Sequence, residues 1–167
     1  MINEVELNDI NASSISVIMV SYMTGPVLFE AIKHVILDTK ISELIIIDNG
    51  NPEQVREKLF LLVKSYGHIK VKTGHGNIGF SKGCNYGAKV ASGNYLLFLN
   101  PDALITKNSA TKLMNLGKNL KRPWITGGKL INSRGEEQRG SRRGEVTLFS
   151  SLLTVLHLGK KTIHQEN

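Results

Sequence analysis

Several residue types that restrict a protein's class are scarce in this sequence of 167 residues. Cys84 is the only cysteine, which excludes an internal disulfide and a zinc site with several cysteine ligands. The longest apolar stretch, residues 148–158, is shorter than the roughly 20 residues that span a bilayer. Residues 1–14 are polar and acidic and lack the pattern of a signal peptide. These absences predict a cytoplasmic protein in a reducing compartment.

Negative charge is also scarce relative to positive charge. The chain has 21 Lys and Arg residues against 14 Asp and Glu residues, which gives a net charge of +7. Such a balance suits anionic partners, whether nucleic acid, lipid headgroups or a diphosphate. Aromatic residues make up only 6% of the chain and no nucleic-acid recognition motif is present, so we do not expect a nucleic-acid partner.

Apolar runs of strand length alternate with segments of helical periodicity. The strand-like runs are residues 15–22, 41–47, 68–73, 95–99 and 124–131, and the helical segments are 26–36, 52–63, 80–91 and 110–120. This alternation predicts an α/β fold whose Rossmann-like, mainly parallel sheet has helices on both faces. We expect a main domain over residues 15–145, an N-terminal extension over 1–14, and an amphipathic helix and tail over 146–167.

Two of the helical segments carry more detailed predictions. Asn51 is expected to be an N-cap, with Pro52 in the first helical position and Gln54 completing a capping box. In the next helix, Cys84 is expected to be a small core residue rather than a nucleophile. The residues expected to face the sheet from that helix are Phe80, Cys84, Gly87, Ala88 and Ala91.

Polar residues stand where three of the predicted strands end. Ligands of parallel sheets bind beyond the carboxyl ends of the strands, so Tyr22, Asp48 and Asp102 are candidate site residues. Asp102 can supply one carboxylate to Mg²⁺ or Mn²⁺, with water and substrate phosphate completing the shell. The sequence Asn100-Pro101-Asp102 can equally form a plain turn that leads into a helix.

The Asp48 position also has two readings. A carboxylate at a strand end can accept a hydrogen bond from the imide N–H of uracil or thymine. The sequence Asp48-Asn49-Gly50 can instead form a turn in which the Asp and Asn side chains bond the local backbone. The residues themselves leave both readings open.

Residues 74–79 match the pattern G-x-G-x-x-G, follow a predicted strand and precede a predicted helix, with Asp102 about 20 residues further on. This arrangement is compatible with an NAD-dependent Rossmann oxidoreductase. However, the pattern follows the third strand instead of the first, and the acidic residue comes after Asn100-Pro101. The glycines could also serve only to let the helix pack closely on the sheet.

Four motifs taken in order resemble glycosyltransferase family 2, especially its rhamnosyltransferase-like bacterial branch. They are residues 17–22, 46–50, 77–87 and 93–102, and the likeness extends to about residue 143. The resemblance implies a GT-A fold, a UDP- or dTDP-sugar donor and a Mg²⁺ or Mn²⁺ ion. It also implies transfer with inversion to a glycan or lipid-linked acceptor, in bacterial cell-surface polysaccharide synthesis.

The resemblance assigns roles by position. Ser21 and Tyr22 would line the nucleotide pocket, and Asp48 would contact the base. The residues that would flank the nucleoside are Asn77, Gly79, Lys82 and Asn85. Asn100 and Asp102 would occupy the family's Asp-x-Asp motif, with Asp102 bound to the metal. Members of the family usually continue through a segment with a Glu-Asp pair that furnishes the catalytic base. We therefore expect a truncated chain that binds the donor without the base, or a non-catalytic nucleotide-binding remnant.

The last segment has apolar residues at helical spacing beside Lys160 and Lys161. It is expected to pack on the core, and the alternative is contact with the surface of a membrane at its inner face. Homo-oligomer formation is left open by the sequence.

Overall fold

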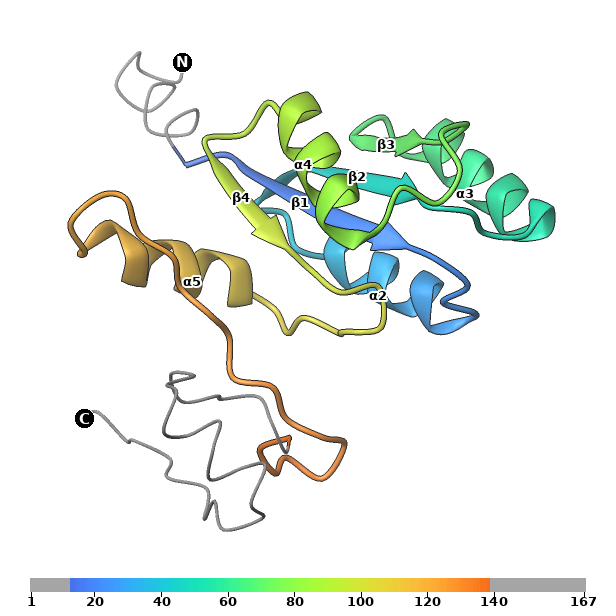
Figure 1. Cartoon of the computed structure of the whole chain (residues 1–167). Coiled ribbons are helices and arrows are strands. Elements are labelled where there is room, and N and C mark those ends of the chain that lie inside the picture. The colour runs from blue at the N-terminus through green and yellow to red at the C-terminus, as the bar shows by residue number, and fades with distance from the viewer. Residues whose placement is uncertain (1–12, 139–167) are drawn as a thin grey trace, which may run out of the picture. The chain divides into compact units, whose positions relative to one another are not determined.

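A computed structural model describes residues 13–138, which fall into two units divided after Thr126 (Figure 1). The first unit contains these elements in order: β1 (Ile15–Ser21), α2 (Val27–Ile36), β2 (Ile41–Asp48), α3 (Glu53–Ser65), β3 (Ile69–Lys72), α4 (Phe80–Val90), β4 (Tyr95–Phe98) and α5 (Ser109–Lys118). In the second unit, Ile131 and Glu137 form an isolated antiparallel bridge. The expected helix over residues 146–167 lies outside the described residues, as does most of the expected N-terminal extension.

The four strands form one parallel sheet in the order β3-β2-β1-β4. The predicted parallel α/β architecture is therefore confirmed. β1 and β2 occupy the middle of the sheet, which explains why nearly all of their residues are buried and most are apolar. Ser21 pairs with Asp48 in the register, so the carboxyl ends of these two strands lie side by side.

Helices cover both faces of the sheet. Val17, Met19 and Ile46 belong to a core formed with α2, α3 and α5, whereas Ile18 and Ile47 belong to a second core formed with α4. Figure 1 shows α4 on one side of the sheet and α2 and α5 on the other. Each fully buried aliphatic side chain contributes about 1.5–3 kcal/mol relative to an exposed one.

The sheet-facing side of α4 differs in part from the prediction. Cys84 packs against the second core as expected, and burial raises the pKa of its thiol. Phe80, by contrast, is 57% exposed because it begins the helix beyond the carboxyl edge of the sheet. Gly83 and Gly87 are the buried residues of α4, and an ideal Cβ at Gly87 would lie 2.5 Å from a methyl carbon of Ile18.

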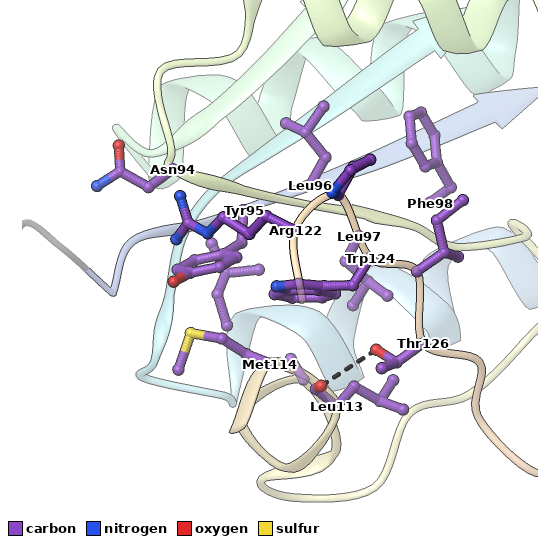
Figure 2. Close-up of a pocket in the computed structure, with 14 residues that line it drawn as sticks. Asn94, Tyr95, Leu96, Leu97, Phe98, Leu113, Met114, Arg122, Trp124 and Thr126 are labelled. Carbon is purple, nitrogen blue, oxygen red and sulfur yellow. Dashed lines mark hydrogen bonds between the residues drawn. The ribbon is translucent and has the colours of Figure 1, made fainter. Parts of the chain in front are cut away.

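The predicted fifth strand, residues 124–131, is wrong, since no ladder forms over 124–130. The segment instead packs side chains inward. The Trp124 ring stacks on Tyr95 with a centroid distance of 5.7 Å and lies against Gly117, and the Thr126 hydroxyl donates to the Leu113 carbonyl oxygen (Figure 2). Trp124 and Thr126 thus pack inward without strand pairing, and residues 127–131 are exposed.

Among residues 13–138, no helix combines the length and the apolarity needed to cross a bilayer.

Candidate functional site

A cavity of about 330 Å³ lies at the carboxyl edge of the sheet. It is lined by Val20, Tyr22, Thr24, Asn49, Asn77, Gly79, Phe80 and Pro101. These residues come from the ends of β1 and β2, from the start of α4 with the loop before it, and from the turn after β4. The separate polar corners noted in the sequence therefore meet at one cavity, whose size falls in the range of small-molecule pockets.

Asp48 lies beside this cavity but does not line it. Its Oδ1 accepts hydrogen bonds from the Gly50 and Asn51 backbone N–H groups and from the Asn51 side chain, at 2.9–3.3 Å. Its Oδ2 accepts from the Thr73 hydroxyl at 2.8 Å and from Arg56 Nε at 3.1 Å. Burial acts to raise the pKa of Asp48, but these hydrogen bonds outweigh it and the pKa is lowered. The carboxylate thus holds the β2–α3 turn.

Asn51 joins the ends of β1 and β2. Its amide nitrogen donates to the carbonyl oxygen of Ser21 at 3.1 Å and to the carboxylate of Asp48 at 2.9 Å. The predicted N-cap role is therefore wrong: the side chain faces the strands, and Pro52 directly precedes α3 without a side-chain cap. Ser21 is buried and its hydroxyl contacts Asn51 and Thr24, so it supports the cavity wall from behind.

Asn49 and Asn77 connect the β2–α3 turn to the glycine-rich loop. Asn49 Nδ2 donates to Asn77 Oδ1 at 2.9 Å, and Asn49 Oδ1 accepts from the Ile78 backbone at 3.0 Å. Asn77 Oδ1 also accepts from the Gly79 backbone at 3.0 Å. Because the oxygen of Asn77 has these two donors, its amide N–H groups are left to meet an acceptor atom of a ligand.

The glycine-rich loop needs its glycines. Gly74, Gly76 and Gly79 have φ values of +90°, +63° and +82°, a region that side chains with a Cβ rarely adopt. The glycines of the G-x-G-x-x-G pattern therefore shape the loop that delivers Asn77 to the cavity.

Two aromatic rings stand at the cavity. Tyr22 is 53% exposed and Phe80 is 57% exposed, although both line it. The Tyr22 ring lies 3.5 Å from the point where a Cβ on Gly50 would be, and Gly50 has a φ of +109°. Exposed rings of this kind offer flat apolar faces on which a planar base can stack.

The Asn100-Pro101-Asp102 corner forms a turn in which the Ala103 N–H donates to the Asn100 carbonyl oxygen at 3.0 Å. The Asn100 and Asp102 side chains are exposed, and neither forms a hydrogen bond or ion pair with another described residue. Within the described chain, no three His, Cys, Asp or Glu side chains group to hold a metal. One free carboxylate beside an amide oxygen fits a hard cation that takes its other ligands from water and phosphate.

Lys82 and Asn85 are exposed on α4 and do not line the cavity. The residues that the sequence did not single out are Thr24, Asn49, Phe80 and Pro101 as lining groups, and Asn51, Arg56 and Thr73 as supporting groups. Asn49 could have been found from the alternation of side chains at a strand end, because Asp48 and its neighbour must point to opposite sides.

Comparison with known proteins identifies the family. Residues 16–150 match glycosyl transferase family 2. The chain belongs to this family. Over 103 residues it is 31% identical to the minor teichoic acid biosynthesis protein GgaB of Bacillus subtilis (strain 168), and the match covers 60% of this chain and 11% of GgaB.

Solved structures share the fold. S. aureus TarS 1–349 in complex with UDP-GlcNAc matches with a TM-score of 0.53 and 21% identity, over 63% of this chain and 31% of TarS. GalNAc-T7 with UDP, GalNAc and Mn²⁺ matches with a TM-score of 0.55 and 26% identity, over 60% of this chain and 20% of GalNAc-T7. The predicted GT-A fold is confirmed, and this chain spans a third or less of each of these relatives.

Proposed function

We propose that the chain binds the nucleoside diphosphate part of a UDP- or dTDP-sugar and is the donor-binding part of a sugar transferase of cell-surface polysaccharide synthesis. This proposal rests mainly on the cavity at the carboxyl edge of the sheet, which joins the ends of β1 and β2 to the glycine-rich loop and to the Asn-Pro-Asp corner. The relatives support this proposal, since TarS is solved with UDP-GlcNAc and GalNAc-T7 with UDP and Mn²⁺.

In this proposal the aromatic rings and the polar groups of the cavity contact different parts of the ligand. Tyr22 and Phe80 stack on the base, and Asn77 donates its amide N–H groups to oxygen atoms of the nucleoside. Ser21 and Asp48 hold in place the ends of β1 and β2, which carry lining residues of the cavity. Lys82 and Asn85 are exposed on α4 outside the cavity lining, and their role beside the nucleoside rests on the family resemblance alone.

Asp102, with Asn100 beside it, would hold a Mg²⁺ or Mn²⁺ ion. Such an ion supplies Lewis-acid charge neutralisation for the donor diphosphate. The protein's part is to keep the Asp102 carboxylate unpaired, so that it is available at the corner next to the cavity.

Two buried carboxylates, Asp48 and Glu43, are unsuited to act as the general base for an acceptor hydroxyl. Asp48 is engaged by five donor groups, and Glu43 lies near the opposite end of β2, engaged by Ser16, Lys70 and Ser92. We therefore extend the proposal to the reaction: inverting transfer to a glycan or lipid-linked acceptor takes its general base from a carboxylate other than Asp48 and Glu43.

A thermal-shift experiment tests the proposal. Saturating UDP with Mn²⁺ should raise the melting temperature by roughly 5–10 °C, because a ligand at 100 times its Kd stabilises the native state by about 2.7 kcal/mol. Asp102→Ala should lose the Mn²⁺-dependent part of this shift, whereas Glu57→Ala, which removes an exposed carboxylate of α3, should keep it. Stabilisation by NAD without metal, with no response to UDP, would contradict the proposal and favour an oxidoreductase.

A further inference from the structure

Exposed apolar and cationic side chains follow one another along the chain from the last turn of α5 to Ile125. Leu116, Leu120 and Ile125 are 62%, 53% and 96% exposed. Lys121 and Arg122, both exposed, stand between them in the chain. We call these five residues the α5-end surface.

Packing fixes this surface in place. The Trp124 ring lies against Gly117 of α5, and the Thr126 hydroxyl donates to the carbonyl oxygen of Leu113 at 3.1 Å (Figure 2). The chain segment on either side of Ile125 is therefore attached to the helix. Ile125 points away from its two inward-facing neighbours and is almost fully exposed, at the open side of the cavity of about 580 Å³ that it lines together with Arg122 and residues of β4 and α5 (Figure 2).

The charge of this region has one sign. Residues 103–126 contain five Lys and Arg residues and no Asp or Glu. Lys118 contacts the Tyr95 ring and the Ser13 hydroxyl. Lys121 and Arg122, by contrast, form no ion pair with any side chain in residues 13–138. Their positive charge is therefore free to attract an anionic partner.

We infer that the α5-end surface binds an anionic lipid bilayer. Cationic side chains attract the headgroups of anionic lipids, and exposed aliphatic side chains beside them gain free energy by entering the interface. A polyanion such as nucleic acid would use Lys121 and Arg122 but would leave Ile125 in water, so the mixed surface fits a bilayer better. This contact is separate from the nucleotide cavity and does not depend on the function proposed for it.

Co-sedimentation of the full chain with lipid vesicles tests the inference. The chain should bind vesicles made of equal parts phosphatidylcholine and phosphatidylglycerol, and should bind pure phosphatidylcholine vesicles far more weakly. Combining Lys121→Glu with Arg122→Glu should lower the partition coefficient by roughly 25-fold or more, since each cation near the surface contributes about fivefold. Combining Leu116→Ser with Ile125→Ser should lower binding to the same vesicles.

The matched control lies on α3, where Leu61 is 61% exposed. Leu61→Ser and Lys64→Glu should leave vesicle binding unchanged, and UDP binding should be the same in all these variants if they remain folded. Equal losses from the α3 variants would overturn the inference. Unchanged binding in the α5-end variants would also overturn it, by placing the contact elsewhere, as in residues 146–161. Binding to soluble polyphosphate that matches vesicle binding and ignores Ile125→Ser would show a polyanion site instead.

Discussion

At the scale of single residues, Asn49 sets the orientation of Asn77. The donation from Asn49 Nδ2, together with the Gly79 N–H, fixes Asn77 Oδ1 on the protein side. The amide N–H groups of Asn77 then face outward. Asn49 is buried, so in the proposed function it affects nucleotide binding indirectly, by fixing the orientation of the Asn77 amide.

The change Asn49→Asp replaces the donor by a second acceptor, which faces Asn77 Oδ1. We expect the Asn77 amide to reverse and the affinity for UDP to fall roughly five- to tenfold, the equivalent of one hydrogen bond. Isothermal titration calorimetry measures this loss, and Asn115→Asp on the exposed side of α5 serves as the control. In an Asn77→Ala background, Asn49→Asp should have no further effect on the Kd. A full additional loss there would show that Asn49 acts independently of Asn77.

Glu43 makes stability depend on pH. Burial acts to raise its pKa, but hydrogen bonds from Lys70, Ser16 and Ser92 outweigh it and lower the pKa from 4.5 to about 2. A carboxyl group with a depressed pKa in the native state stabilises that state above its unfolded pKa. This contribution is lost as the pH falls from about 4.5 toward 2.

We expect the free energy of unfolding to fall by roughly 2–3 kcal/mol over this acid range because of Glu43. Urea unfolding at a series of pH values measures the slope. Glu43→Gln should lower stability at neutral pH and flatten the slope, while Glu57→Gln on exposed α3 should leave it unchanged. An equally steep slope in Glu43→Gln would assign the acid sensitivity to other carboxylates.

At the scale of elements, α4 lies so close to β1 that its glycines matter for packing. A Cβ on Gly87 would lie 2.5 Å from Ile18 Cγ2. Gly87→Ala should therefore destabilise the protein by about 1–3 kcal/mol through overpacking, although alanine favours helix by about 1 kcal/mol. The urea midpoint measures this effect. Ser81→Ala, on the exposed side of the same helix, should change stability little, and a stabilised Gly87→Ala variant would mean that α4 can move away from the sheet.

The two central strands and the starts of the first two helices could be predicted from the sequence, because burial on both faces of a strand and proline at a helix start each leave a clear pattern. Most residues of β1 and β2 are apolar since both faces of these strands are covered, and Pro26 and Pro52 mark the starts of α2 and α3. The errors arise where tertiary contacts decide. In the apolar run 124–131, Trp124 and Thr126 pack against β4 and α5 instead of pairing as a strand, and Asn51 bonds to Ser21 and Asp48 instead of capping α3.

At the scale of the whole molecule, the fold explains why distant motifs form one site. Parallel strands place their carboxyl ends at one edge, so Tyr22, Asn77 and Pro101 meet at a single cavity although they are far apart in sequence. This convergence could be predicted from strand order alone. Alternation at the strand end indicates that Asp48 and Asn49 point to opposite sides. It does not indicate which of the two holds the turn, since that depends on which side chain the Arg56 and Thr73 donors reach.

The central claim is that one cavity holds the nucleotide, with the metal at the Asn-Pro-Asp corner. Amide NMR spectra of the labelled chain test it directly. UDP with Mg²⁺ should shift the resonances of Tyr22, Asn49 and Gly79, and replacing Mg²⁺ by Mn²⁺ should broaden most strongly the resonances around Asp102. Asp102→Ala should abolish the broadening. Shifts and broadening centred elsewhere, such as around Glu43 at the opposite end of the sheet, would contradict the account.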